Sequence, residues 1–318
     1  MKPILNDRAM FADATEEYRS PEEPSAGDTV KLKFRTAKYN VDRVEVVVNG
    51  IAYSMKKFMT NTNFDYYIAE FTLGAQRTEY YFHALVGRTS IYYNQAGPYR
   101  ELNPTYNFVI NPGFKTPDWA KGAVIYQIYV DRFRNGDKSN DVVDNEYVYI
   151  GEPVHSITDW NEYPATMDVR NFYGGDLQGV LDKMDYLESL GIDAIYFNPL
   201  FVSPSNHKYD IQDYDYIDPH FGVIVNDGGE PLPDNARSND NATKYKKRVT
   251  DYANLEASNE FFAKLVEEAH RRNIKVIIDG VFNHCGSFNK WLDRERIYEG
   301  SEGFDKGAYV DKESPYHD

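Results

Sequence analysis

Apolar and polar residues alternate in short runs between residues 28 and 110, and no helical spacing interrupts them. The runs are rich in Val, Ile, Tyr and Phe, which favour a half-buried strand. Asn49 and Gly50 separate two runs, and this pair is typical of a tight hairpin. Short strands without helices predict a β-sandwich over residues 28–118, after an N-terminal extension of residues 1–27. The predicted strands are 28–35, 43–49, 51–57, 64–73, 79–87, 90–94 and 106–110.

From Ala123 onward, buried apolar runs alternate with segments of helical spacing. Apolar residues recur every three or four positions in residues 176–191, and Gly191 stands at the expected helix end. A second helix follows Ser258, which we expect to be its N-cap. This alternation predicts a parallel βαβαβ unit, so the fold class is α/β after the sandwich. The predicted strands are 123–130, 192–198 and 274–279.

Two long segments interrupt this alternation, residues 131–175 after the first strand and residues 199–257 after the second. Both begin at the carboxyl end of a buried strand, where barrel enzymes carry their active-site loops. The second segment includes residues 223–254, which are polar and rich in Asp and Asn. We predict that they form an exposed insertion, and that the basic run 244–248 is a solvated face.

The net charge of −15 changes which partners we expect. It opposes binding to nucleic acid or to an anionic membrane, because both require positive patches. No apolar stretch reaches the roughly 18 residues of a spanning helix, and the first residues lack the apolar core of a secretion signal. Cys285 is the only cysteine. We interpret it as a packing residue or an inert thiol, and we expect a cytoplasmic protein.

Hard oxygen donors crowd the loop after the first strand of the α/β part. They are of the type that Ca²⁺ takes as ligands, and Gly136 permits a sharp bend among them. The spacing is not that of an EF-hand, and a loop of solvated Asx turns explains the residues equally well. Gly174 and Asp176 of the sequence YGGD could complete a calcium shell. The donors in the loop are Asn135, Asp137, Asn140 and Asp141.

Polar and aromatic residues also follow the second and third buried strands. Tyr209 and Asp210 lie in a loop dense with Tyr, Asp and His. A ring beside carboxylates suits a sugar site, and an ordinary hydrogen-bonded loop is the alternative. Asp279, Asn283 and His284 directly follow the third strand. α/β proteins place their sites at such carboxyl ends, although a polar exit with Asp279 as a cap is also consistent.

Five motifs occur in order between Trp119 and His284. They are YQIYVDRFRNGD, FYGGDLQGV, LGIDAIYFNPLF, HKYDIQDYDYIDPHFG and DGVFNH. Together they resemble the α-amylase family of glycoside hydrolases, and within it the neopullulanase, cyclomaltodextrinase and maltogenic amylase branch. Those enzymes also carry a β-sandwich before the barrel. The resemblance implies that residues 119–284 are the first part, about three βα units, of a (β/α)₈ TIM barrel, and that residues 285–318 begin the small domain inserted after strand three.

The resemblance also implies roles for the candidate residues. His284 would contact the sugar at the cleavage subsite, and Tyr209 would stack on the same sugar. Asp279 would support an arginine and the nucleophile, and Asp210 belongs to the motif of Tyr209. The residues that match the calcium site of the neopullulanase branch are Asn135, Asp137, Asn140, Asp141, Gly174 and Asp176.

The retaining mechanism of the family needs two carboxylates on either side of the scissile bond. In the family, an aspartate nucleophile, a glutamate acid/base and a second aspartate follow strands four, five and seven. We therefore expect all three beyond Asp318, and we do not assign Asp279 as the nucleophile. The 318-residue chain alone is expected to be inactive.

The leading hypothesis is an α-glucan hydrolase that acts by the retaining mechanism on maltooligosaccharides, cyclodextrins or pullulan. Its expected partner is an α-glucan oligosaccharide, and its expected cofactor is Ca²⁺ in the first loop. One alternative is a non-catalytic α-glucan-binding module, which the Tyr-rich sandwich permits. Another is that the sandwich is a dimerisation arm that gives a homodimer, as similar domains do in the neopullulanase branch.

Overall fold

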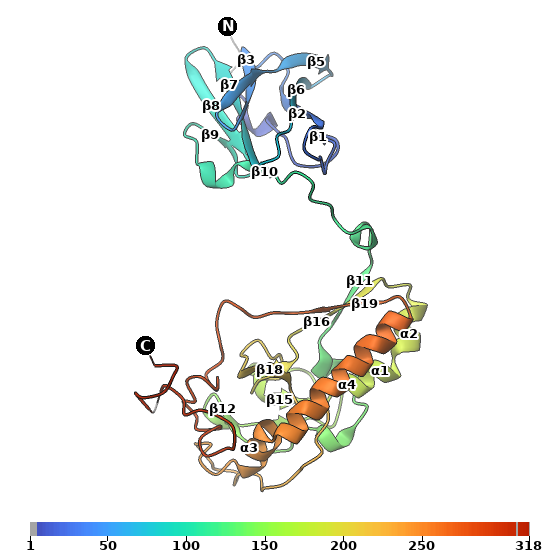
Figure 1. Cartoon of the computed structure of the whole chain (residues 1–318), viewed down its shortest axis with the longest axis vertical. Coiled ribbons are helices and arrows are strands. Elements are labelled where there is room, and N and C mark those ends of the chain that lie inside the picture. Colours follow the sequence, from blue (N-terminus) through green and yellow to red (C-terminus); the bar gives the residue numbers. More distant parts are fainter. Residues whose placement is uncertain (1–4, 310, 318) are drawn as a thin grey trace. The chain divides into compact units, whose positions relative to one another are not determined.

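The computed structural model describes residues 5–309 and 311–317, and the chain divides into two compact units (Figure 1). The first unit is Met1–Lys121 and the second is Gly122–Asp318. Each unit buries apolar residues of its own. Among the residues described, no helix combines the length and the apolar sequence that a bilayer-spanning segment requires.

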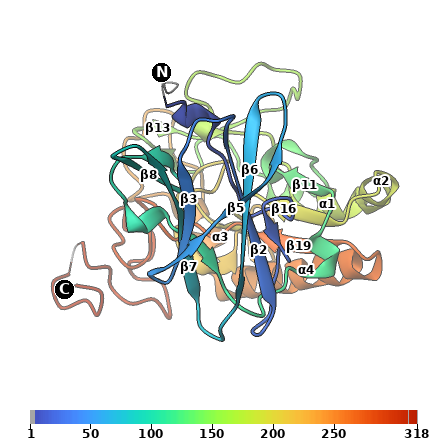
Figure 2. The same cartoon turned by 90° about the horizontal axis from the view of Figure 1, so that it is seen from above.

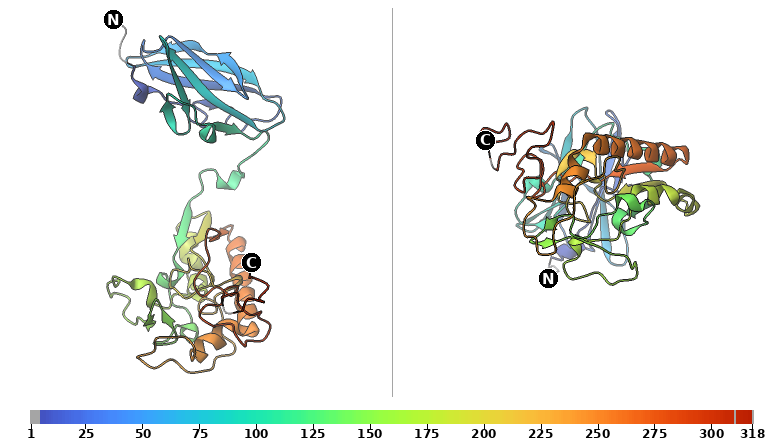
Figure 3. Two further views of the ribbon diagram at one scale, coloured as in Figure 1. Left: turned by 90° about the vertical axis from the view of Figure 1, so that its left-hand side faces the viewer. Right: turned by 90° about the horizontal axis from the view of Figure 1, so that it is seen from below.

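The first unit is a sandwich of two mainly antiparallel sheets (Figures 2 and 3). The strand order is β1-β2-β6-β5 in one sheet and β4-β3-β7-β8-β9 in the other, with β10 also paired to β7. The first sheet contains β1 (Arg19–Ser20), β2 (Thr29–Ala37), β6 (Phe64–Thr72) and β5 (Lys56–Thr60). The second contains β4 (Ile51–Ser54), β3 (Arg43–Val48), β7 (Thr78–Val86), β8 (Thr89–Asn94), β9 (Gly97–Tyr99) and β10 (Phe108–Ile110).

Alternation along the strands explains how the sandwich closes. In β2, Val30, Leu32 and Phe34 are completely buried, while the residues between them face outward or are half-buried. Phe34 stacks on Phe82 of the other sheet, with their ring centroids 4.7 Å apart. Successive side chains of a strand point to opposite faces, so this pattern buries one face of each sheet. The prediction of an N-terminal β-sandwich is confirmed.

Two details of the sandwich differ from the sequence pattern. The predicted strand 51–57 is divided between the two sheets, because the chain crosses from β4 to β5 at the buried Met55. The predicted extension also contributes to the core, since Met10 and Tyr18 are buried in it and β1 pairs with β2.

The second unit contains a parallel sheet in the order β11-β16-β19. Tyr126 pairs with Ile195, which in turn pairs with Val276. Helices cover one face, where Val180 and Leu265 join Ile195 in a single core. The predicted α/β architecture, with the first part of a barrel after the sandwich, is confirmed. Its elements are β11 (Ile125–Ile128), α1 (Leu177–Asp182), α2 (Met184–Ser189), β16 (Ala194–Phe197), α4 (Tyr252–Arg271) and β19 (Lys275–Ile278).

The other face of this sheet is open in the described residues. Ile125 is 52% exposed, and Val124 and Ile278 are similarly exposed. The outer edges of β11 and β19 pair with no other strand among the residues described. Edges and apolar faces of this kind are what the first strands of a barrel present to the strands that follow them.

The loops that follow β11 and β16 form a third apolar core together with residues 285–309. Tyr147, Tyr245 and Phe288 are buried there, one from each segment. Figure 1 draws the C-terminal segment beside β12 and α3. Strands and helices in this region are β12 (Val148–Tyr149), β13 (Glu152–Pro153), β14 (His155–Ser156), β15 (Asn171–Phe172), β17 (Phe201–Val202), β18 (Asp213–Ile217) and α3 (Thr243–Thr250).

Short 3-10 helices occur in both units. They lie at Asp7–Ala9, Pro104–Tyr106, Asp118–Ala120, Val130–Arg132, Lys138–Asn140 and Asp168–Arg170.

The insertion 223–254 is not the exposed decoration that its composition predicts. It contains α3, whose Tyr245 and Val249 are completely buried. The interpretation of 244–248 as a solvated face is wrong for Arg248, which is only 2% exposed. The polar composition of the insertion did not indicate that Tyr245, Arg248 and Val249 are buried, because the residues that bury them lie on other loops.

Both predicted helices have different bounds in the structure. The segment 176–191 is broken at Lys183, which has φ −103° and ψ 9° between α1 and α2. The helix expected after Ser258 begins earlier, with Asp251 as the N-cap that accepts a hydrogen bond from the Ala253 amide at 3.0 Å. Ser258 is a buried residue within α4, and its hydroxyl donates to the Asn254 carbonyl at 2.7 Å.

Candidate active-site loops and cation loop

Tyr209, Asp279 and His284 lie together beyond the carboxyl end of β19. The Tyr209 hydroxyl donates to Asp279 Oδ2 at 2.8 Å, and His284 Nε2 donates to the Tyr209 carbonyl at 3.0 Å. Burial, with the bond to Asp279, raises the pKa of Tyr209 to about 12. Hydrogen bonding to the same carboxylate raises the pKa of Tyr196. The arrangement brings a ring, a carboxylate and an imidazole together on neighbouring loops.

Asp210 is not part of this group in the structure. Its Oδ1 accepts a hydrogen bond from the Ser205 hydroxyl, and its Oδ2 is buried without a hydrogen-bond partner in the described contacts. The same hydroxyl lies 3.1 Å from His207 Nδ1, which accepts a bond from the Tyr209 amide at 3.0 Å. Asp210 therefore braces the loop that carries Tyr209.

Sequence reasoning missed Tyr214, which supports the backbone of the candidate site. Its hydroxyl reaches two carbonyls, that of Val281 at 2.9 Å and that of His284 at 2.8 Å. Trp291 stacks on its ring, with the centroids 5.6 Å apart and the planes 8° from parallel. Tyr214 lies in β18, and the only signal in the sequence was the alternation of that short strand.

The predicted calcium residues converge on one loop. Asn135 Nδ2 donates to Asp141 Oδ1 at 2.7 Å. A Cβ at Gly174 would lie 2.5 Å from both of these atoms, so the Gly174 backbone approaches them as closely as glycine allows. Burial raises the pKa of Asp141 to about 6, and the charge of Asp176 adds to this rise.

Buried side-chain oxygens without a hydrogen-bond partner indicate whether a cation would fit this loop. Asn135 Oδ1 and Asn140 Oδ1 are buried and have no hydrogen-bond partner among the described residues. Buried acceptors of this kind normally have a partner. Within the described residues, no cluster of three or more His, Cys, Asp or Glu could hold a metal. A cation here would therefore take a mixed set of amide and carboxylate oxygens, which suits Ca²⁺.

Asp137 and Asp176 organise the backbone of the same loop. Asp176 caps α1 and accepts hydrogen bonds from the Gly179 amide at 2.6 Å and from the Gly136 and Asp137 amides at 3.0 and 2.7 Å. Asp137 accepts a bond from the Ser139 amide at 2.9 Å, as the Asx-turn interpretation predicts. These two carboxylates hold the loop, while Asn135, Asn140 and Asp141 present oxygens within it.

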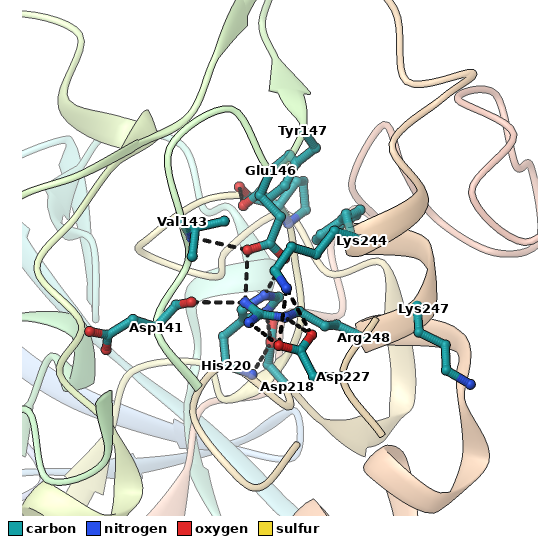
Figure 4. A network of polar contacts seen from close by, with 12 residues as sticks. Asp141, Val143, Glu146, Tyr147, Asp218, His220, Asp227, Lys244, Lys247 and Arg248 are labelled. Atoms are coloured by element: carbon teal, nitrogen blue, oxygen red, sulfur yellow. Dashed lines mark hydrogen bonds and ion pairs between the residues drawn. The ribbon is translucent and has the colours of Figure 1, made fainter. Parts of the chain in front are cut away.

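A buried network of charges lies beside this loop (Figure 4). His220 is held between two carboxylates, with Nδ1 2.8 Å from Asp218 and Nε2 2.7 Å from Glu146. Asp218 also binds Lys208 at 2.6 Å, and Glu146 binds Arg248 at 2.9 Å. His220 is buried and both of its ring nitrogens contact carboxylates, which is typical of a structural role. Glu146 carried no signal in the sequence, and the basic run that contains Arg248 indicated a surface position.

The network makes a prediction for the pH dependence of unfolding. Charge pairing lowers the pKa of Glu146 and Asp218, against the effect of burial, and raises that of His220. The carboxylates stabilise the fold above their ordinary pKa values of 4.5 and 3.8, and this stability is lost as the pH falls through the lower folded values. The contribution of His220 is complete below its ordinary 6.5 and is lost as the pH rises through its raised pKa.

The free energy of unfolding of the second unit is therefore expected to be greatest between about pH 4.5 and pH 6.5. Urea denaturation across pH measures it, and a His220→Gln variant should show a weaker decline on the alkaline side. A stability that keeps rising above about pH 7 would contradict the prediction.

The fold and the two loops define a class of protein: a sandwich followed by parallel βα units, with polar site residues at the carboxyl ends of the strands, as in barrel enzymes. Residues 127–240 and 235–318 match the family described as alpha amylase, catalytic domain. Residues 23–111 match the alpha amylase N-terminal ig-like domain. The chain belongs to the α-amylase family, and the resemblance seen in its motifs is confirmed.

Named relatives agree with this assignment. The chain is 37% identical over 281 residues to a cyclomaltodextrinase of Thermoanaerobacter pseudethanolicus, covering 83% of this chain and 40% of that protein. It is 34% identical over 295 residues to neopullulanase 2 of Thermoactinomyces vulgaris, covering 87% and 41%. The solved type III pullulan hydrolase from Thermococcus kodakarensis aligns with a TM-score of 0.50 at 26% identity, covering 96% and 45%. The chain thus spans about two fifths of the length of the curated relatives it matches.

Proposed function

We propose that the chain forms the front part of a retaining α-glucan hydrolase that acts on maltooligosaccharides, cyclodextrins or pullulan. The observation that carries this proposal is the group of Tyr209, Asp279 and His284 at the carboxyl end of β19. The names of the relatives, a cyclomaltodextrinase and a neopullulanase, support the substrate class.

The residues of this chain would bind and orient the sugar. The Tyr209 ring would stack on a pyranose face, and the His284 imidazole, fixed through Nε2, would direct its other nitrogen toward a hydroxyl. Asp279 would hold the Tyr209 hydroxyl and accept from further donors through its second oxygen. In this proposal the nucleophile and the acid/base, which a retaining glycosidase holds about 5 Å apart, would come from outside residues 1–318.

The test uses the gene product extended beyond Asp318. We expect it to release reducing ends from at least one of β-cyclodextrin, pullulan and maltoheptaose in the presence of Ca²⁺. The 318-residue chain should release none. Release of no reducing ends by the extended protein from any of the three would overturn the proposal.

We also propose that the loop of Asn135, Asn140 and Asp141 binds Ca²⁺. The free buried oxygens and the raised pKa of Asp141 support this, because a divalent cation satisfies the oxygens and favours the ionised carboxylate. Bound there, Ca²⁺ would supply charge neutralisation and join the loop to Gly174. It takes no part in bond cleavage in this proposal.

Replacing Asp141 by asparagine removes one ligand charge and is expected to weaken Ca²⁺ binding by about tenfold or more. Calorimetric titration of the chain with CaCl₂ measures this affinity. Asp159→Asn, at an exposed position in the same segment, is the matched control and should bind as the parent does. Equal affinities for the two variants would place Ca²⁺ elsewhere.

A second role for the sandwich rests on its exposed strand β5. Every residue of this edge strand is exposed, including Phe58 and Met59. Exposed apolar side chains on an unpaired edge favour pairing with another chain, so a homodimer through the sandwich is the alternative we propose. Sedimentation equilibrium of the extended protein as a monomer would exclude it. Maltoheptaose binding that survives loss of the Tyr209 ring would instead favour a glucan-binding sandwich.

We propose a cytoplasmic location for the protein. Cys285, interpreted from the sequence as a packing residue or an inert thiol, is exposed in the structure. A free exposed thiol suits a reducing compartment. Fractionation of cells that produce the full protein tests this, and recovery outside the cytoplasm would contradict it.

A further inference from the structure

The insertion 223–254 contacts the cation loop, residues 135–146, through the Arg248 side chain (Figure 4). One nitrogen of its guanidinium, Nη1, donates to the Asp141 carbonyl at 2.8 Å and to Glu146 at 2.9 Å. The other two nitrogens bind both oxygens of Asp227, at 2.9 and 3.0 Å. One side chain thus joins the insertion to both ends of the segment 141–146.

Because the Arg248 guanidinium is buried away from water, it needs these hydrogen-bond and charge partners within the protein. Arg248 is 2% exposed, and Glu146 has no exposed surface. Asp227 is partly exposed and also binds Lys244 at 3.0 Å, and Glu146 also binds His220. The buried cation therefore faces two carboxylates and one carbonyl, and charge-assisted bonds of this kind fix geometry strongly.

Further contacts attach the insertion along the same segment. Asn239 exchanges two hydrogen bonds with the Val148 backbone, at 2.8 and 3.0 Å. The Leu232 amide donates to the Asn145 carbonyl at 2.7 Å. On the other side of the loop, Asn140 Nδ2 donates to the Gly222 carbonyl at 3.0 Å, just before the insertion begins. The insertion therefore frames the cation loop and its continuation.

We propose that Arg248 is a positioning residue for the cation loop, and that the insertion serves to hold residues 135–146 in the conformation that binds Ca²⁺. The inference rests on the proposed calcium site and names what fixes it. Arg248 touches the carbonyl of Asp141, so it orients the peptide whose side chain offers oxygen to the cation. Partners of metal ligands of this kind commonly control affinity.

The guanidinium shape is essential to this role. Its planar fork reaches the Asp141 carbonyl, Glu146 and both oxygens of Asp227 at once. An ammonium at the same place carries the charge but is a single point that cannot span these partners. Arg248→Lys therefore separates the positioning effect from the loss of a buried charge.

The experiment compares Arg248→Lys and Arg248→Met with the control Arg237→Met in the full chain. Arg237 lies in the same insertion and also binds the first segment, through Glu152 at 2.7 Å, but its side chain is 69% exposed. Calorimetric titration with CaCl₂ is expected to show affinity about tenfold weaker for Arg248→Lys and unchanged for Arg237→Met. Arg248→Met should bind no more tightly than Arg248→Lys.

Hydrogen exchange without Ca²⁺ supplies a second readout. Amides 135–146 should exchange faster in Arg248→Lys than in the parent, while those of the sandwich should not change. Unchanged exchange in this loop, or equal Ca²⁺ affinity in Arg248→Lys and Arg237→Met, would overturn the inference. If the parent chain binds no Ca²⁺, the calcium proposal itself is overturned. The hydrogen exchange of the loop is measured without Ca²⁺, so it tests the positioning role of Arg248 separately.

Discussion

Replacing Glu146 by alanine should destabilise the second unit by about 3–5 kcal/mol, the largest effect on stability that we expect from a single change. Glu146 is completely buried and binds His220 at 2.7 Å and Arg248 at 2.9 Å. Its removal leaves a buried guanidinium and a buried imidazole without their shared counter-charge. Arg248 keeps Asp227 and His220 keeps Asp218, so the magnitude is set by the loss of one of two counter-charges from each buried cation.

Urea denaturation followed by pulsed hydrogen exchange reads the two units separately. The midpoint of residues 122–317 should fall, while that of the sandwich should stay the same. Glu152→Ala is the control, because its bond to Arg237 is exposed and should contribute less than about 1 kcal/mol. Similar midpoints for the two variants would show that the network adds no stability.

Replacing Tyr209 by alanine should weaken binding of maltoheptaose about thirtyfold, the largest effect on sugar binding that we expect. The ring would stack on a pyranose, and loss of such a buried aromatic contact costs about 2 kcal/mol. The variant also removes the hydroxyl that binds Asp279. Calorimetric titration of the extended protein measures the affinity.

Two controls separate the contributions of Tyr209. Tyr209→Phe keeps the ring and loses only the hydroxyl, so it should retain most of the affinity. Tyr163→Ala removes a ring that is 92% exposed in the same unit and should leave binding unchanged. A loss as large in Tyr209→Phe as in Tyr209→Ala would assign the effect to the hydroxyl and would contradict stacking.

Periodic patterns predicted the parts of the fold that depend on local burial. The alternation around Val30, Leu32 and Phe34 has period two because one face of β2 is buried, so it can be read without knowing the partner sheet. The resemblance to the α-amylase family grouped Tyr209, Asp279 and His284, and the structure brings them together. Parallel strands end at one edge of their sheet, and residues that follow them meet there.

The sequence could not predict the side chains whose environment comes from distant loops. Arg248 sits in a basic run that is typical of a surface, but in the structure it is buried and contacts Glu146, Asp227 and the Asp141 carbonyl. His220 and Tyr214 likewise take their roles from partners more than 60 residues away. Burial of a charge depends on tertiary contacts, which no local pattern records.

Helix ends were also misplaced, because several residues can cap a helix. Ser258 and Asp251 are both good N-caps by type. The helix begins at Tyr252, with Asp251 as its N-cap, because the buried Asn254 and Leu255 extend its packed face toward the N-terminus. The first predicted helix is interrupted at Lys183, although lysine is not a helix-breaking residue. The spacing of apolar residues alone could not show this interruption.

The stack of Trp291 on Tyr214 gives this protein an intrinsic optical probe. The indole contacts the ring whose hydroxyl holds the carbonyls of Val281 and His284, so its emission responds to movement of that backbone. The chain has only three tryptophans, and Trp119 belongs to the first unit. With Trp119 and Trp160 both replaced by phenylalanine, the fluorescence of Trp291 would report movement of the backbone around His284 without an attached label.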